Sequence, residues 1–128
     1  MLDERIRSLV DGPNFAVITT LLPDGMPMTH VMWVSFLDGH LLMNTEVHRQ
    51  KFKNVTRDPR VVVTVWDRED NYRYGEVRGR VVGTVTGDEA RAHIDELSRK
   101  YLGHDYATRV QSERVILKIE PDRQRFHG

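Results

Sequence analysis

The sequence contains no cysteine among its 128 residues. This excludes disulfide bonds and thiolate metal sites, and it is compatible with a reducing compartment. No apolar run approaches the roughly 18 residues that a membrane-spanning helix requires, and the N-terminal segment MLDERIRSLV is charged throughout. The sequence therefore predicts a cytoplasmic protein with neither a membrane span nor a signal peptide.

Net charge is also lacking, because 19 basic residues balance 19 acidic ones. A general nucleic-acid-binding protein would have a strongly basic surface, so no nucleic-acid partner is expected. Glycine-rich dinucleotide loops, P-loops and nucleophile elbows are missing as well. The six histidines are scattered over different predicted elements and form no ligand pair, so no metal site is predicted.

What is present is a series of strand patterns in hairpin order, which fits one domain spanning residues 1–128. The strand patterns cover residues 14–22, 27–36, 40–44, 60–66, 72–86 and 114–120, with a further edge strand at 123–127 after Pro121. Helices are expected at 2–10, between 44 and 58, and from an N-cap at Asp88 to a stop at Gly103. Residues 104–112 are ambiguous and could hold one more helical turn. About six strands with two or three helices indicate an antiparallel barrel decorated by helices.

The longest strand pattern, 72–86, contains Gly75, Gly79 and Gly83 at intervals of four. Glycines inside a strand mark bulges, bends or a close approach of another backbone. A long strand bent at several glycines is what a small barrel needs. The alternative is that these glycines divide two separate strands.

A short helix is predicted within 44–66, NTEVHRQKFKNVTRDPRVVVTVW, before an apolar strand. Asn44, Thr45 and Glu46 offer side-chain oxygens that could cap its first turn. Asp58–Pro59 ends it, because the residue before a proline is pushed out of the α region.

The same segment concentrates positive charge. From Arg49 to Arg60 there are five basic residues and one acid, a local charge of +4 in a neutral chain. A focused positive region favours a small anionic ligand over a polyanion, and the free N–H groups of a helix N-terminus favour phosphate. The alternative interpretation is a solvated surface helix.

Aromatic residues suggest where a planar ligand could pack. Tyr72 and Tyr74 alternate by two and therefore face the same side of their strand. Trp33 and Trp66 each end an apolar strand pattern, where filling the core is the alternative role. Aromatic rings beside a cationic pocket suit a planar anionic ligand.

Taken together, the 44–66 segment resembles the signature of the split-barrel flavin-binding superfamily that includes pyridoxamine phosphate oxidases. The pattern R-x-K-x-x-N-x-x-R-D-P-R is similar to the actinobacterial branch that uses the deazaflavin coenzyme F420. The first hairpin, AVITTLLPDGMPMTHVMWVSFLDGHLLMNT, and the segment NYRYGEVRG match too, so the resemblance spans nearly the whole chain.

The resemblance implies a mainly β (α+β) fold, a six-stranded antiparallel split β-barrel with two to four short helices. It implies a homodimer whose cofactor sites lie at the subunit interface. Arg49 and Lys51 match its phosphate-binding positions, and Asn54 matches the motif asparagine. Helical geometry instead places Arg49, Lys53 and Arg57 on one stripe, so Lys53 remains the alternative to Lys51.

Further cofactor-binding residues follow from the resemblance. They are Met28, Thr29, His30, Asn44, Tyr72 and Tyr74. The first three lie on the strand that approaches the ring, whereas the two tyrosines come from the partner subunit. No catalytic residue is identified, although His30 and Tyr74 are candidates for delivering a proton.

The function implied is an oxidoreductase that passes a hydride from reduced coenzyme F420 to an electron-poor small molecule. The cofactor carries the hydride, and the protein orients it in a water-poor cleft. The proton for the product could come from solvent, His30 or a tyrosine hydroxyl. Two alternatives stay open: an FMN-dependent oxidase or flavin reductase, and a carrier that binds flavin or haem without turnover.

Overall fold

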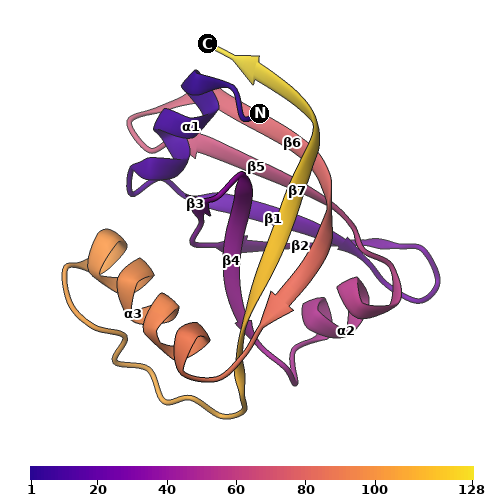
Figure 1. The fold of residues 1–128 in the computed structure, drawn as a ribbon. Helices are drawn as coiled ribbons and strands as arrows, with labels where there is room; N and C mark the ends of the chain where they lie inside the picture. The colour runs from indigo at the N-terminus through magenta and orange to yellow at the C-terminus, as the bar shows by residue number, and fades with distance from the viewer.

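Seven strands form one antiparallel sheet in the computed structural model, which describes residues 1–128, and three helices pack on it (Figure 1). The strands are β1 Ala16–Leu21, β2 Pro27–Met32, β3 Ser35–Leu37, β4 His40–Glu46, β5 Arg60–Asp67, β6 Asp70–Val85 and β7 Arg114–His127. The helices are α1 Glu4–Asp11, α2 Gln50–Arg57 and α3 Asp88–Leu102. In the sheet the strands follow the order β2-β1-β5-β6-β7-β4-β3. None of the helices has the length and apolarity needed to cross a membrane.

The predicted mainly β, antiparallel architecture is confirmed, but the sheet has seven strands and stays open, whereas six strands in a barrel were expected. The difference lies in segment 27–36, which is two strands and not one. It breaks at Trp33–Val34, and the strands before and after the break, β2 and β3, form opposite edges of the sheet. Only three Cα–Cα steps, about 11 Å, separate Met32 from Ser35. The sheet must therefore curl until its two edges nearly meet.

The last turn of α3 holds this break in place. Val34 is fully buried, so its backbone N–H and C=O need partners inside the protein. The N–H donates to the Tyr101 hydroxyl at 3.2 Å, and the carbonyl accepts from Lys100 Nζ at 2.6 Å. The Tyr101 ring also stacks on Trp33, with 5.3 Å between ring centroids. Two neighbouring residues of one helix thus fix the link between the sheet edges.

The glycine-bearing segment is one continuous strand, as predicted, and not two. β6 pairs with β5 on one side and β7 on the other, and its register with β7 shifts between Arg78 and Gly79 and again between Val81 and Gly83. A Cβ atom on Gly75 would lie 2.6 Å from a side-chain carbon of Ile6. The absence of a side chain at Gly75 therefore allows helix α1 to pack closely against β6. A Cβ on Gly79 would lie 2.1 Å from the Glu120 carbonyl oxygen.

Several predicted boundaries are wrong. Asn44, Thr45 and Glu46 belong to the buried end of β4 and do not cap α2, whose N-cap is Arg49 without a side-chain hydrogen bond. The N-cap of α3 is Gly87 rather than Asp88, although Gly103 ends that helix in the left-handed conformation as predicted.

β7 also departs from expectation, since it does not stop at Pro121 but runs on to His127. Pro121 lies opposite Gly79, beside the register shift, where a residue without an N–H group is tolerated. Residues 104–113 form no helix and connect α3 to β7 irregularly.

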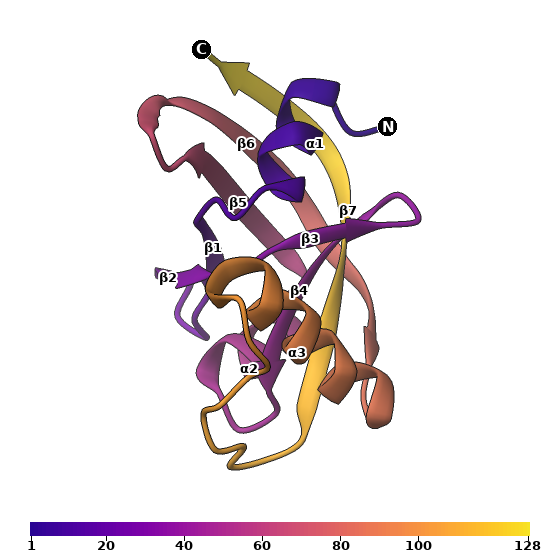
Figure 2. The ribbon, with the colours of Figure 1, turned by 90° about the vertical axis from the view of Figure 1, so that its left-hand side faces the viewer.

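The apolar core fills the curved sheet and is closed at one end by α1. It is a cluster of 17 buried residues to which α1 contributes Ile6, Leu9 and Val10. Asp3 caps α1 by accepting the N–H of Arg5 at 2.8 Å. A smaller cluster of Leu42, Ala90 and Ile116 lies under α3, which crosses β4 in Figure 2. Helices α2 and α3 lie at the end of the sheet away from α1 (Figure 1).

We predict that Gly79→Ala destabilises the protein, because the new methyl group would meet a backbone oxygen that cannot move without disturbing β7. Overpacking of this kind costs about 1–3 kcal/mol of unfolding free energy. The matched control is Gly83→Ala in the same strand, where the nearest atom, a flexible Lys118 carbon, is 3.7 Å away. Urea unfolding should separate the two variants, and equal midpoints would contradict the proposed steric role of Gly79.

Candidate functional site

A cavity of about 500 Å³ lies at the α2–α3 end of the fold. Its walls come from the ends of β2 and β4, the start of β7, the N-terminus of α2, helix α3 and the irregular segment after α3. Its lining is Phe15, Val31, Met32, Trp33, Asn44, Thr45, Glu46, Arg49, Lys51, Ile94, Leu97, Leu102, His104, Tyr106, Ala107, Thr108 and Arg114. This size is typical of a small-molecule site.

One side of the cavity is basic. Arg49 is the N-cap of α2 and Lys51 lies in its first turn, so both converge with the helix N-terminus on the cavity. Burial, Arg49 and Arg114 lower the pKa of Lys51. No acidic side chain lies within 4 Å of Arg49 or Lys51. An anion bound here would relieve the repulsion among these cations. Lys53 is exposed and does not line the cavity.

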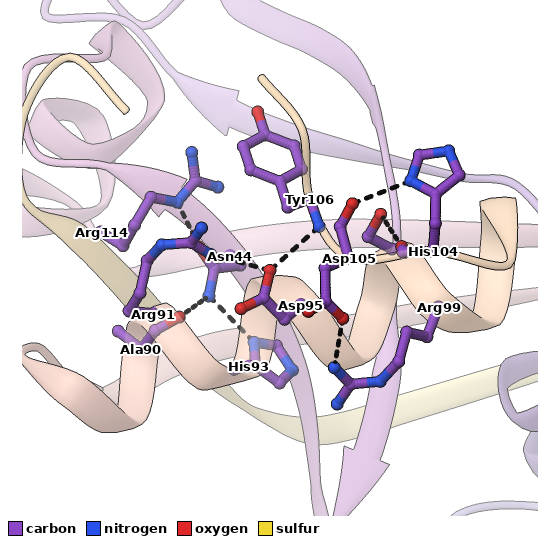
Figure 3. Close-up of polar contacts among 11 residues, drawn as sticks. Asn44, Ala90, Arg91, His93, Asp95, Arg99, His104, Asp105, Tyr106 and Arg114 are labelled. Carbon is purple, nitrogen blue, oxygen red and sulfur yellow. Dashed lines mark hydrogen bonds and ion pairs between the residues drawn. The ribbon is translucent and has the colours of Figure 1, made fainter. Parts of the chain in front are cut away.

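A buried polar network, which we call the Asn44 network, forms another part of the wall (Figure 3). Arg114 Nε donates to Asn44 Oδ1 at 2.8 Å. The Asn44 amide nitrogen donates to the Ala90 carbonyl at 2.9 Å and contacts His93 Nδ1 at 3.0 Å. Because that nitrogen can only donate, His93 Nδ1 accepts and its proton is on Nε2, which donates to Ser35 Oγ at 3.0 Å. Every hydrogen-bonding group of the Asn44 side chain is therefore in use.

Glu46 completes this network on its other side. It is 4% exposed, and one carboxylate oxygen accepts the backbone N–H groups of Gln111 and Ser112 at 2.6 and 2.7 Å. Burial raises the pKa of Glu46, but these two N–H groups and Arg114 outweigh it, and the net shift is downward. Glu46 is thus ionised at neutral pH. It holds the irregular segment and partly balances Arg114, at 3.6 Å from Nη1.

Aromatic rings form an apolar wall. Trp33 is stacked on Tyr101 and meets Tyr106 edge-on, with 6.2 Å between the centroids of Trp33 and Tyr106. The Tyr106 ring also lies 5.3 Å from the Arg114 guanidinium carbon. Its backbone N–H donates to Asp95 of α3 at 2.9 Å, which anchors the segment beside the cavity. A planar ligand could pack against this wall.

Of the residues predicted on β2, none lines the cavity, whereas the next three residues of the chain do. Thr29 is exposed, and its hydroxyl group is hydrogen-bonded to the hydroxyl group of Thr19, with 2.8 Å between the two oxygens. Met28 precedes it toward the hairpin. His30 lies closer, with Nδ1 3.5 Å from Lys51 Nζ. Burial and the cations Lys51 and Arg49 lower the pKa of His30, so its ring is neutral at pH 7.

Asn54 is fully buried and does not face the cavity. Its amide nitrogen donates to the Thr20 hydroxyl at 3.0 Å, and its oxygen accepts from Gln50 at 2.8 Å. Both polar atoms are used within the protein, so Asn54 fixes the start of α2 against β1. Its contribution to the site is to orient the basic helix.

Tyr72 and Tyr74 lie near the start of β6, and the same chain does not bring them to the cavity. Tyr72 is 80% exposed. The Tyr74 ring stacks on His127 at 5.1 Å between ring centroids. Within one chain, therefore, the predicted phosphate-binding residues and the tyrosine pair are separate.

Sequence reasoning missed Arg114 and the segment from His104 to Thr108 as parts of the site. Arg114 opens a strand of alternating residues, where an arginine signals an exposed position, yet it is 8% exposed. The segment before it has no periodicity from which its position could be inferred. A buried arginine is recognisable only once its partners, Asn44 and Glu46, are known.

Comparison with known proteins identifies the family. Residues 2–128 match the family described as pyridoxamine 5'-phosphate oxidase, and the chain belongs to it. The expected resemblance is thereby confirmed, and the fold is a flavin-binding one. Comparison with curated protein sequences returns no significant match.

Solved structures agree with this assignment. A protein described as an F420 reductase superimposes with a TM-score of 0.84 at 29% identity, covering 97% of this chain and 98% of its own. A conserved hypothetical protein from Mycobacterium tuberculosis gives 0.75 at 24% identity, covering 99% and 84%. General Stress Protein 26 from Bacillus anthracis gives 0.70 at 21% identity, covering 97% and 92%. The last two show the fold alone.

The buried His93 makes stability depend on pH. Burial, Lys100 and Arg114 lower the pKa of His93 to about 4, against 6.5 for the free side chain. The unfolded chain therefore binds the proton more tightly, so the stabilisation is complete above pH 6.5 and is lost as pH falls toward 4. From pH 7 to pH 5 the loss is about 2 kcal/mol.

We predict that His93→Gln, which cannot titrate in this range, removes about 2 kcal/mol of that pH dependence. The measurement is urea unfolding of both proteins at pH 7 and pH 5. For each protein, the unfolding free energy at pH 5 is subtracted from that at pH 7, and the two differences are then compared. This comparison cancels the contribution of every other titrating group and any loss of stability that the substitution causes equally at both pH values. An identical pH dependence in the two proteins would show that His93 is not held neutral by the fold.

Proposed function

We propose that this protein is a deazaflavin-dependent oxidoreductase, which passes a hydride from reduced coenzyme F420 to an electron-poor organic acceptor. The observation that carries the proposal is a pair of cations without an acidic partner, Arg49 and Lys51, at a helix N-terminus beside an apolar, aromatic cavity. This arrangement suits a planar ring linked to a phosphate. The similarity to an F420 reductase along nearly the full length of both chains supports the deazaflavin.

The residues of the chain would bind and orient the reactants. The bound deazaflavin supplies the hydride chemistry. Arg49, Lys51 and the first N–H groups of α2 hold the phosphate, and Trp33 packs on the ring and excludes water. His30 presents Nδ1 to the Lys51 ammonium group as an acceptor, which keeps its proton on Nε2. That atom is a candidate proton donor for the reduced product.

The preference for deazaflavin over FMN depends on charge outside the phosphate site. Coenzyme F420 carries a carboxylate-bearing tail beyond its phosphate, and Lys53, Arg57 and Arg60 are the further cations of the basic segment that could pair with it. Arg60 is already paired with Asp58 at 2.7 Å, and Arg57 donates to the Leu21 carbonyl. Lys53 has no acidic partner and is therefore free to pair with a carboxylate of the tail. Exposed pairs contribute about 0–1 kcal/mol, so the preference is modest.

The experiment is a competition between reduced coenzyme F420 and FMN, followed by fluorescence at low and high salt. We expect the deazaflavin to bind more tightly at low salt and its advantage to shrink as salt screens the tail. Addition of a quinone acceptor should then oxidise the bound deazaflavin catalytically. FMN that binds tightly at all salt concentrations and resists displacement would instead establish the FMN-dependent alternative. Binding without turnover of any acceptor would indicate the carrier.

Variants test whether binding occurs at this cavity. Arg49→Ala and Lys51→Ala should each weaken the cofactor about tenfold to a hundredfold, because each removes a charge-assisted hydrogen bond worth roughly 1.5–3 kcal/mol. Lys53→Ala is the matched control from the same helix and should change affinity far less. If Lys53→Ala weakened cofactor binding more than Lys51→Ala did, the phosphate would lie on the face of α2 that carries Arg49, Lys53 and Arg57.

We further propose a homodimer whose sites combine both subunits. Tyr72 and Tyr74 are remote from the cavity of their own chain, so they could reach a ligand only from a partner. Val31 and Leu102 are apolar, more than half exposed and at the cavity, where a second subunit would cover them. Sedimentation velocity at micromolar concentration should show a dimer. A monomer that binds cofactor at full strength would contradict the shared site.

A further inference from the structure

We infer that Arg114 is a second ligand-binding group of the cavity, which binds the carbonyl edge of the flavin or deazaflavin ring. The inference rests on the proposed function, because it concerns how the same cavity holds its cofactor. It assigns to Arg114 a contact distinct from the phosphate contacts of Arg49 and Lys51.

The Arg114 guanidinium is fixed at one end and available at the other. Its Nε is bonded to Asn44, which is itself held by His93 and the Ala90 carbonyl. Glu46 is the single acid within 4 Å, and at 3.6 Å it is beyond hydrogen-bond distance. The Tyr106 side chain is a further hydrogen-bond partner of the guanidinium, but the terminal amino groups line the cavity with more donors than Tyr106 can accept. In Figure 3 they point away from Asn44, toward the side on which Tyr106 lies.

The cavity lining carries more positive than negative charge. Arg114 is 8% exposed, and Glu46 holds the only carboxylate of the cavity lining. Three cations, Arg49, Lys51 and Arg114, thus face one acid. Binding one phosphate at α2 leaves Arg114 and Glu46 as a loose pair, whose donors still favour an electron-rich partner. None of the Arg114 nitrogens is both buried and without a partner, so the donors that the protein leaves free are open to the cavity, where a ligand can accept them.

The polar edge of the ligand ring needs hydrogen-bond donors that only Arg114 can supply in this part of the cavity. A flavin or deazaflavin ring has one benzenoid edge and one pyrimidinedione edge with two carbonyl oxygens. Burying the carbonyl edge in the cavity requires hydrogen-bond donors there. The Asn44 side chain is fully used and Glu46 only accepts, so neither can supply them. The Arg114 guanidinium can donate to one carbonyl oxygen of this edge and to the unprotonated ring nitrogen next to it.

The test uses two pairs of ligands in which the ring is the same and only one member carries a phosphate. Riboflavin and FMN form the first pair and differ in the phosphate alone. The deazaflavin riboside and coenzyme F420 form the second pair and differ in the phosphate together with the carboxylate-bearing tail. Arg114→Gln should weaken both members of a pair by the same factor, roughly tenfold to a hundredfold for a charged hydrogen bond. Lys51→Ala should weaken only the phosphorylated member. The absorbance band of the bound ring should also shift in Arg114→Gln, because a cation leaves its polar edge.

The matched control is Arg80→Gln, which removes a half-exposed cation of β6 that is paired with Asp122 and does not line the cavity. It should change neither affinity nor absorbance. Circular dichroism and unfolding midpoints establish that each variant is folded. If Arg114→Gln does not fold, Arg114→Lys keeps a charge beside Glu46 without the planar fork, and it should weaken riboflavin and FMN equally.

The outcomes are distinguishable. Unchanged riboflavin binding in the folded Arg114 variant, while the wild type binds FMN or F420, would overturn this inference and leave the proposed function standing. Weakening of the phosphorylated ligand alone would place Arg114 in the phosphate site and also overturn it. A wild-type protein that binds none of the four compounds would overturn the proposed function, and the inference with it.

Discussion

The buried backbone of Val34 is the constraint on which the rest of the structure depends. It joins two strands that end on opposite edges of the sheet, so it can pair with neither edge as a regular strand residue. Its N–H and C=O are satisfied by Tyr101 and Lys100 instead. Burial lowers the pKa of Lys100 to about 8, so the ammonium group persists at neutral pH. Helix α3 is thus hydrogen-bonded to the link between the two sheet edges, and the cavity lies between α3 and this part of the sheet.

The Asn44 network adds rigidity at the cost of desolvating charge. The buried Arg114 and Glu46 side chains are 3.6 Å apart, between Nη1 and Oε2. At this distance their attraction offsets less of the cost of desolvating the two charges than a close, bidentate ion pair would. His93 must stay neutral to remain there, which lowers stability in acid. These costs are offset by the apolar core under α1, at the other end of the molecule. A network that stabilises poorly but fixes one side chain against a cavity is what precise ligand placement requires.

Local chemistry explains which features could be predicted from the sequence. The glycines of β6 and the basic segment before Asp58–Pro59 each act over a few residues, so their patterns carry the information. The break at Trp33–Val34 could not be found this way. Its residues continue a strand pattern, and their conformation is decided by Tyr101, more than sixty residues later. Arg114 was missed for the same reason, since its burial depends on Asn44 and Glu46 across the sheet.

The position of the tyrosine pair connects the fold to assembly. β6 spans 16 residues, so its two ends contact different parts of the molecule. One end leads into α3 beside the cavity, while the other carries Tyr72 and Tyr74 near the termini (Figure 1). In a single chain, an 80% exposed tyrosine beside a stacked one has no structural need to be aromatic. Pairing two chains so that this end of β6 meets the partner's cavity would give both the exposed ring and the open side of the cavity an apolar contact.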